Sequence, residues 1–224
     1  MTRTVDITTP ARSEDVPRHL AALSARCTAL ANQIRERLER TDRTVAFANF
    51  CMYVGGELRR LSMFYPANVP GLAWATRNLF EVNLIVRHVL VSDDNLQRWL
   101  GQLLQDEKEF IEGILSVSSD QPRNTNHEQL NSRLNGLQDM SRRHDLQFAK
   151  PFRTQTIAES LGMSDEYIGL YKLFSKYVHP SSLLVNAWYS QEPDFTWLDL
   201  FVVKAQVYAG DTIQRLASAC RLEA

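Results

Sequence analysis

"VPRHLAALSARCTALANQIRERL", residues 16–38, is the stretch that decides the fold class. Its apolar residues recur at alternating spacings of four and three, which is the heptad pattern of a helix that packs against another helix. The members of this seam are Val16, Leu20, Leu23, Cys27, Leu30, Ile34 and Leu38. We expect the helix to begin at an Asp15 N-cap with Pro17 in its first turn. Its partner is another helix of the chain or a second copy, and the regularity of the seam favours a homodimer.

Helical spacing continues through the rest of the chain. Glycine and proline are sparse, and no short alternating segments bounded by turns indicate strands. We expect further helices at residues 43–65 (weakened near Gly55-Gly56), 72–91, 92–115, 127–146, 156–162, a stretch ending at His179, and 194–221. The sequence therefore predicts a single all-α domain, a helical bundle of about seven helices over residues 14–224. Residues 1–13 are expected to form a flexible N-terminal arm.

The composition and charge of the chain do not indicate a polyanionic partner. The chain is 44% hydrophobic and 23% charged with a net charge of −1, so nothing requires a polyanionic partner. "TIAESLGMSDEYI", residues 156–168, has the spacing of a helix-turn-helix. Its second helix opens with Asp165 and Glu166, which would repel phosphate. We therefore expect no sequence-specific binding to DNA.

Neither a metal or cofactor site nor a membrane span is indicated. The three cysteines are far apart, and no CxxC, Walker, dinucleotide or HExxH pattern occurs, so we expect no metal and no cofactor. The most apolar run, residues 80–91, is interrupted by polar and charged residues. The first twenty residues lack the apolar core of a signal peptide. We expect a cytoplasmic protein that does not enter a membrane.

The expected helix at residues 72–91 carries two polar faces. One stripe holds Trp74, Arg77, Glu81, Leu84 and His88, and the other polar face holds Thr76, Asn83 and Arg87. Arg77 and Glu81 are four residues apart and can pair. One face should meet solvent, and the other the bundle interior or an interface. The pair is either a surface ion pair, worth roughly a few tenths of a kcal/mol, or a pocket-lining pair that awaits a third partner.

"YKLFSKYVHPSS", residues 171–182, combines hydroxyl and cationic groups at a helix end. Tyr171, Ser175 and His179 follow one helical line, and Lys176 lies beside them. One interpretation is structural, because a charged His favours a helix C-terminus and Pro180 stops the helix. The other is functional, with His179 as a general acid–base and neighbouring side chains positioning a ligand.

The "RNLFE" of Arg77–Glu81, followed by residues 171–182, resembles DUF5677, a family of bacterial helical proteins of unknown function. The matching residues are Arg77, Glu81, Tyr171, Ser175, His179, Pro180 and Ser181. The resemblance covers roughly residues 47–188 and leaves the first helix unmatched. It implies an all-helical bundle without an established activity, whose polar motif residues share a cleft.

A weaker similarity is to HEPN domains, many of which are metal-independent ribonucleases of bacterial defence and toxin systems. Their R-x(4–6)-H motif is not met here, because no arginine lies four to seven residues before His179. We favour a non-catalytic binding or interaction protein that holds a small anionic ligand or partner. Its expected binding residues are Glu81, Tyr171, Ser175, Lys176 and Ser181, beside Arg77. The alternative is a HEPN-like enzyme that acts on RNA or nucleotides, with His179 and Arg77 as catalytic residues.

Overall fold

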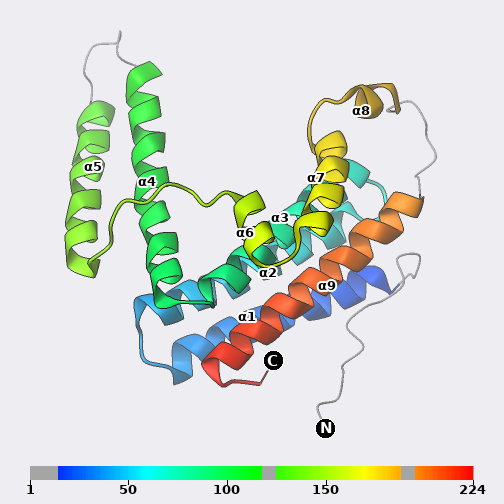
Figure 1. Ribbon diagram of the computed structural model, residues 1–224, viewed down its shortest axis with the longest axis horizontal. Coiled ribbons are helices and arrows are strands. Elements are labelled where there is room, and N and C mark those ends of the chain that lie inside the picture. Colours follow the sequence, from blue (N-terminus) through cyan, green and yellow to red (C-terminus); the bar gives the residue numbers. More distant parts are fainter. Residues whose placement is uncertain (1–14, 118–124, 188–194, 224) are drawn as a thin grey trace. The chain divides into compact units, whose positions relative to one another are not determined.

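The computed structural model describes residues 15–117, 125–187 and 195–223, and every helix or strand in these ranges is an α-helix (Figure 1). The predicted all-α fold is confirmed. The helices are α1 (Val16–Arg37), α2 (Asp42–Phe64), α3 (Val69–Val89), α4 (Asp93–Val117), α5 (Thr125–His144), α6 (Thr154–Ser160), α7 (Ser164–Val178), α8 (Ser182–Ala187) and α9 (Phe195–Cys220).

The described residues thus hold nine helices where the sequence predicted about seven, and two of them, α6 and α8, are short. They divide into two compact units. The first unit comprises the described residues up to Arg87 and those from Thr154 onward, and the second is His88–Arg153. The single domain expected over residues 14–224 stays a prediction, and the expected arm lies outside the described residues.

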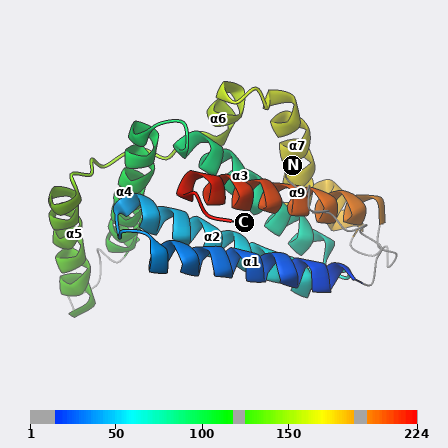
Figure 2. The same cartoon turned by 90° about the horizontal axis from the view of Figure 1, so that it is seen from below.

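Helix α1 packs on α2 and α9 within the first unit (Figure 2). The apolar seam of α1 is buried from Val16 to Ile34, and Leu38 caps the end of the helix. Asp15 occupies the N-cap position without a capping hydrogen bond, and its carboxylate pairs with Arg18 instead. The seam is therefore used inside the chain, which settles where α1 packs and removes the argument for a homodimer. The dimer itself stays a prediction.

Helix α2 is continuous where the sequence analysis expected it to weaken. The reason is that Gly55 lets α1 and α2 approach closely: the Ser24 hydroxyl donates to the Gly55 carbonyl at 2.8 Å. A Cβ at residue 55 would lie 3.1 Å from the Cβ of Cys27. The start of α2 is fixed by a capping box between Thr41 and Thr44.

Helices α3, α7 and α9 meet through aromatic and polar contacts. The hydroxyl of Thr76 on α3 donates to the carbonyl of Phe201 on α9 at 3.2 Å. The ring of Phe80 lies 4.9 Å from that of Tyr208 on α9 and 6.3 Å from that of Tyr167 on α7. Phe174 of α7 packs on Phe201. These contacts place α7 beside the part of α3 that carries Arg77.

The second unit is built on the pair α4 and α5. Its core holds Leu104, Ile111, Leu137 and Leu146, with Leu130, Leu134 and Met140 packed against it, so α5 contributes an apolar stripe to this core. The segment after α5 returns to α4 at Gly101, whose carbonyl accepts from the Ala149 amide at 3.3 Å. The start of α4 is capped, since the Asn95 amide donates to the Ser92 hydroxyl at 3.2 Å.

Candidate functional site

Arg77, Glu81 and Tyr171 meet between α3 and α7. The Arg77 Nε donates to Glu81 Oε1 at 2.8 Å, as the spacing of four residues predicts. The Arg77 guanidinium carbon lies 5.3 Å from the centroid of the Tyr171 ring, within the range of a cation–π interaction. The Tyr171 ring in turn stacks on Tyr167, with centroids 5.4 Å apart. The guanidinium is therefore held by a carboxylate of its own helix and by an aromatic ring of α7.

This cluster is neither buried nor fully solvated. The side chains of Arg77 and Glu81 are 21% and 30% exposed, and Tyr171 is 41% exposed. Among the described residues, the Arg77 side chain forms a hydrogen bond only through its Nε–H. The four N–H groups of its two terminal nitrogens thus stay available to a partner.

A second charged pair lies one to two turns from the end of α2. The Arg60 guanidinium pairs with Glu57, and it lies 5.5 Å from the ring centroid of Trp74, which is 39% exposed. Trp74 and Arg77 are three residues apart on one face of α3, so the two arginine–aromatic pairs are neighbours. The sequence analysis missed Glu57. Its signal is a carboxylate beside Leu58 in the run of residues that α2 buries.

Glu57 is a buried carboxyl group, with a side chain that is 1% exposed. Burial raises its pKa, while Arg60, Asn78 and Tyr53 act in the opposite direction. Within the part of the chain that the structure describes, its Oε2 atom has no hydrogen-bond partner. Burial, followed by the nearby Glu57, also raises the pKa of Tyr53 to about 12.

The second predicted cluster is a helix end. Helix α7 stops at Val178 with His179 as its C-cap, and the Ser181 hydroxyl donates to the Lys176 carbonyl at 2.6 Å. The Ser181 amide donates to the His179 carbonyl, also at 2.6 Å. These bonds satisfy the carbonyl groups that a helix leaves open at its end. The side chains of Lys176 and His179 are exposed.

The structure does not bring His179 to Arg77. His179 lies eight residues beyond Tyr171, which is about 12 Å along a helix axis at 1.5 Å per residue. Ser175 lies between them and is partly exposed. No contact joins the side chains of His179 and Arg77 within the described ranges. Of the predicted site residues, Arg77, Glu81 and Tyr171 are together, and Lys176, His179 and Ser181 gather at the end of α7.

Comparison with known families matches residues 70–194 to DUF5677, which is described as a family of unknown function. The chain belongs to the DUF5677 family. The match includes Arg77, Glu81, Tyr171 and the end of α7, and it leaves α1 and α2 entirely outside. No curated protein and no solved structure matches the chain.

The opposite polar face of α3, also within the DUF5677 match, looks into the bundle. Asn83 is buried, and its Nδ2 donates to Asp211 Oδ2 on α9 at 2.7 Å. The same carboxylate oxygen forms ion pairs with Arg87 at 3.1 Å and with Arg215 at 2.7 Å. Burial alone would raise the pKa of Asp211, but these partners outweigh it and hold the pKa below its usual value. This face is satisfied internally, which leaves the Arg77 face as the one directed outward.

A fourth charged cluster joins α7 to α9. Glu166 Oε1 accepts from Lys204 at 2.6 Å and from the Tyr208 hydroxyl at 2.7 Å. Burial opposes ionisation of Glu166, but the bonds from Lys204 and Tyr208 outweigh it and lower its pKa. Burial and the adjacent Glu166 raise the pKa of Tyr208. Because its members satisfy one another, we assign this cluster to the packing of α7 on α9.

Two functional features are absent from the described residues. No group of three or more His, Cys, Asp or Glu side chains in these ranges could hold a metal ion. No helix there combines the length and the apolarity that crossing a membrane requires.

Proposed function

We propose that this DUF5677 protein is a non-catalytic binding protein that holds a small anionic ligand, or an anionic group of a partner, on Arg77. The observation that carries the proposal is the unused capacity of this guanidinium, which commits one of its five N–H donors within the described residues. Two parallel N–H groups of an arginine match a carboxylate or a phosphate.

The surroundings of Arg77 support this role because they fix the guanidinium before a ligand arrives. Glu81 holds the Nε edge, and the Tyr171 ring lies against the guanidinium. A side chain that is already ordered loses less conformational entropy on binding. The exposed ring of Trp74, three residues away, offers an apolar surface to the body of the ligand. We therefore expect an aromatic anion to bind better than a bare one.

The other predicted residues have different roles in this proposal. Glu81 and Tyr171 position Arg77, and Ser175 lies one turn beyond Tyr171 on α7. Lys176 and Ser181 belong to the end of the helix, where Ser181 closes the backbone. The proposal rests on the first two residues and does not need the end of α7.

The test is a calorimetric titration of the purified chain with phenyl phosphate and with benzoate. Arg77→Gln should weaken binding at least about tenfold, which corresponds to about 1.4 kcal/mol. Lys172→Gln is the matched control, because it removes the same charge from the exposed side of α7. It should change the affinity by less than about twofold. Saturable binding that both variants reduce equally would show general charge attraction and overturn the proposal.

The alternative function, a HEPN-like ribonuclease, makes a different demand on the site. His179 and Arg77 would have to act on one phosphate, although about 12 Å of helix separates His179 from the Tyr171 turn. The exposed position of His179 is the one observation in its favour. Metal-independent RNA cleavage by the wild-type chain that His179→Ala abolishes would replace the binding proposal with this one.

A further inference from the structure

A pocket lies at the turn between α1 and α2, outside the segment matched to DUF5677. Its volume is about 390 Å³, within the range of small-molecule sites. We call it the α1–α2 turn pocket, and its lining residues are Ile34, Arg35, Leu38, Arg40, Thr44, Val45 and Asn49. The lining thus contains two arginines, two polar side chains and three apolar ones, but no acidic residue.

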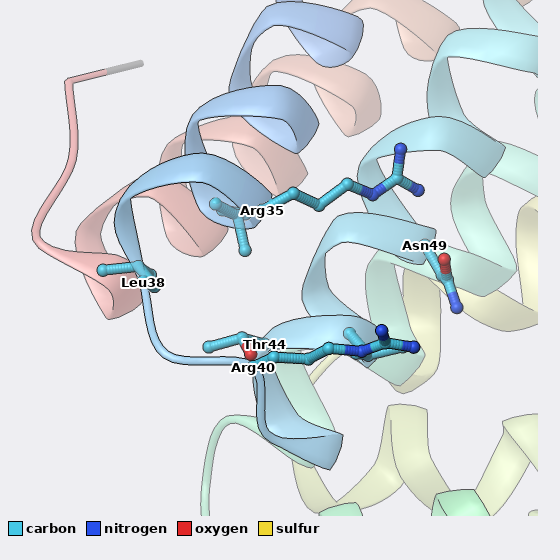
Figure 3. Close-up of a pocket in the computed structure, with 7 residues that line it drawn as sticks. Arg35, Leu38, Arg40, Thr44 and Asn49 are labelled. Atoms are coloured by element: carbon cyan, nitrogen blue, oxygen red, sulfur yellow. The ribbon is translucent and has the colours of Figure 1, made fainter.

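The two arginines of this pocket have no acidic partner in the part of the chain that the structure describes. Neither Arg35 nor Arg40 forms an ion pair or a side-chain hydrogen bond with any residue that the structure describes. Their side chains extend in the same direction, one from the last turn of α1 and the other from the turn, and Asn49 of α2 lies on that side too (Figure 3). Two unpaired guanidinium groups beside one cavity create a strongly anion-attracting position.

The turn that carries Arg40 is held in place by its own hydrogen bonds. The Thr44 hydroxyl donates to the Glu39 carbonyl at 2.8 Å and accepts from the Thr41 amide at 2.9 Å. These bonds fix the backbone on both sides of Arg40. The cation is therefore presented from an ordered turn, and less entropy is lost when a ligand binds.

The same pocket offers an apolar surface. Val45 lies in the second turn of α2 and is 39% exposed, and Leu38 is partly exposed at the end of α1. Ile34 closes the apolar side and is buried. A bare inorganic anion would leave this apolar surface in water, whereas an anion with an apolar body would cover it.

We propose that the α1–α2 turn pocket binds a small amphiphilic anion. Its carboxylate or phosphate head lies between Arg35 and Arg40, and its apolar body covers Leu38 and Val45. This site is separate from the Arg77 site: Thr44 and Glu57 are thirteen residues apart on α2, about 20 Å along the axis. The inference therefore stands on its own and does not depend on the proposed function.

The experiment is a set of calorimetric titrations of the full chain. Octanoate and octyl phosphate are the probes, and the difference between their affinities identifies the preferred head group. Octanol tests whether the charge is needed, and inorganic phosphate tests whether the apolar body is needed. We expect saturable binding of at least one octyl anion, and much weaker binding of both octanol and inorganic phosphate.

Three arginine variants make the test specific. Arg35→Gln and Arg40→Gln should each weaken binding of the octyl anion by about tenfold or more. Arg37→Gln is the matched control, because Arg37 is exposed, carries the same charge and does not line the pocket. It should change the affinity by less than about twofold. All three positions are on the surface, and circular dichroism checks that the variants are folded.

Several outcomes would overturn the inference. They are no saturable binding of either octyl anion to the wild-type chain, equal binding of octanol, or an equal effect of the Arg37 and Arg35 variants. Arg77→Gln separates this site from the proposed function. If Arg77→Gln abolishes binding of the octyl anion while Arg35→Gln leaves it unchanged, the turn pocket is excluded and the Arg77 site is the one occupied.

Discussion

Gly101→Ala should destabilise the second unit, whereas Gly113→Ala on the same helix should stabilise it. A Cβ at residue 101 would lie 2.0 Å from the carbonyl oxygen of Gln147, but a Cβ at residue 113 meets nothing within 4 Å. Non-bonded heavy atoms need about 3.5 Å. The segment around Gln147 would therefore have to retreat by roughly 1.5 Å, and the bond from the Ala149 amide to the Gly101 carbonyl would break.

The size of the effect follows from three contributions. Overpacking costs about 1–3 kcal/mol, and the lost hydrogen bond about 1 kcal/mol. The higher helix propensity of alanine compared with glycine stabilises α4 by about 1 kcal/mol. The expected net loss for Gly101→Ala is about 2 kcal/mol, against a gain of up to about 1 kcal/mol for Gly113→Ala.

Hydrogen exchange of the α4 and α5 amides measures this difference within the second unit. A loss of 2 kcal/mol corresponds to a fall in protection of about 30-fold, and Gly113→Ala should raise protection. Equal protection in the two variants, or higher protection in Gly101→Ala, would refute the close approach of the Gln147 segment to α4.

Three further predictions concern the first unit. Gly55→Ala should be less stable than Gly56→Ala by about 1 kcal/mol. The reason is that a Cβ at residue 55 meets Cys27 at 3.1 Å, while one at residue 56 meets only the end of Arg59 at 3.9 Å. Urea unfolding measures the difference, and a more stable Gly55→Ala would contradict the prediction. Glu166 has a lowered pKa, so the stability it provides is present above its ordinary pKa of 4.5 and lost as the pH falls through the folded value. Glu166→Gln should therefore be less stable at neutral pH and flatten the acid limb of a plot of melting temperature against pH, and an unchanged limb would argue against its bonds to α9. Glu57 has a raised pKa, so its contribution is lost as the pH rises through the folded value. Relative to wild type, Glu57→Gln should gain stability between acid and neutral pH, and a relative loss over that range would contradict its burial.

Local periodicity predicts the long helices because each one buries a continuous apolar stripe. The seam from Val16 to Ile34 is found where the spacing places it. Helix α8 was not predicted, since six residues are too few to show a period. In the sequence, Gly55 predicts a weak point in the helix, but in the structure it makes a close contact with α1. A tertiary contact of this kind leaves no local signal.

In the candidate site too, contacts within one helix could be predicted from the sequence, and contacts between helices could not. The Arg77–Glu81 pair lies within one helix, so a spacing of four residues is enough to predict it. The position of Tyr171 against Arg77 depends on how α7 packs on α3, which the sequence suggests only through the family resemblance. Glu57 was missed because its neighbours in sequence, Gly56, Leu58 and Arg59, do not indicate that α2 buries its side chain. His179 would act beside Arg77 only in the ribonuclease alternative, and the sequence could not show that eight residues of α7 separate it from the Tyr171 contact.

The central claim is that the terminal nitrogens of Arg77 bind an anion. The most direct measurement is an NMR titration with phenyl phosphate that follows the Arg77 Nε–H signal, assigned by its loss in Arg77→Lys. The account predicts a saturable shift of this signal, because the anion binds the same guanidinium whose Nε–H is held by Glu81. If phenyl phosphate binds and the Arg77 signal does not move, the anion lies elsewhere and the claim is wrong.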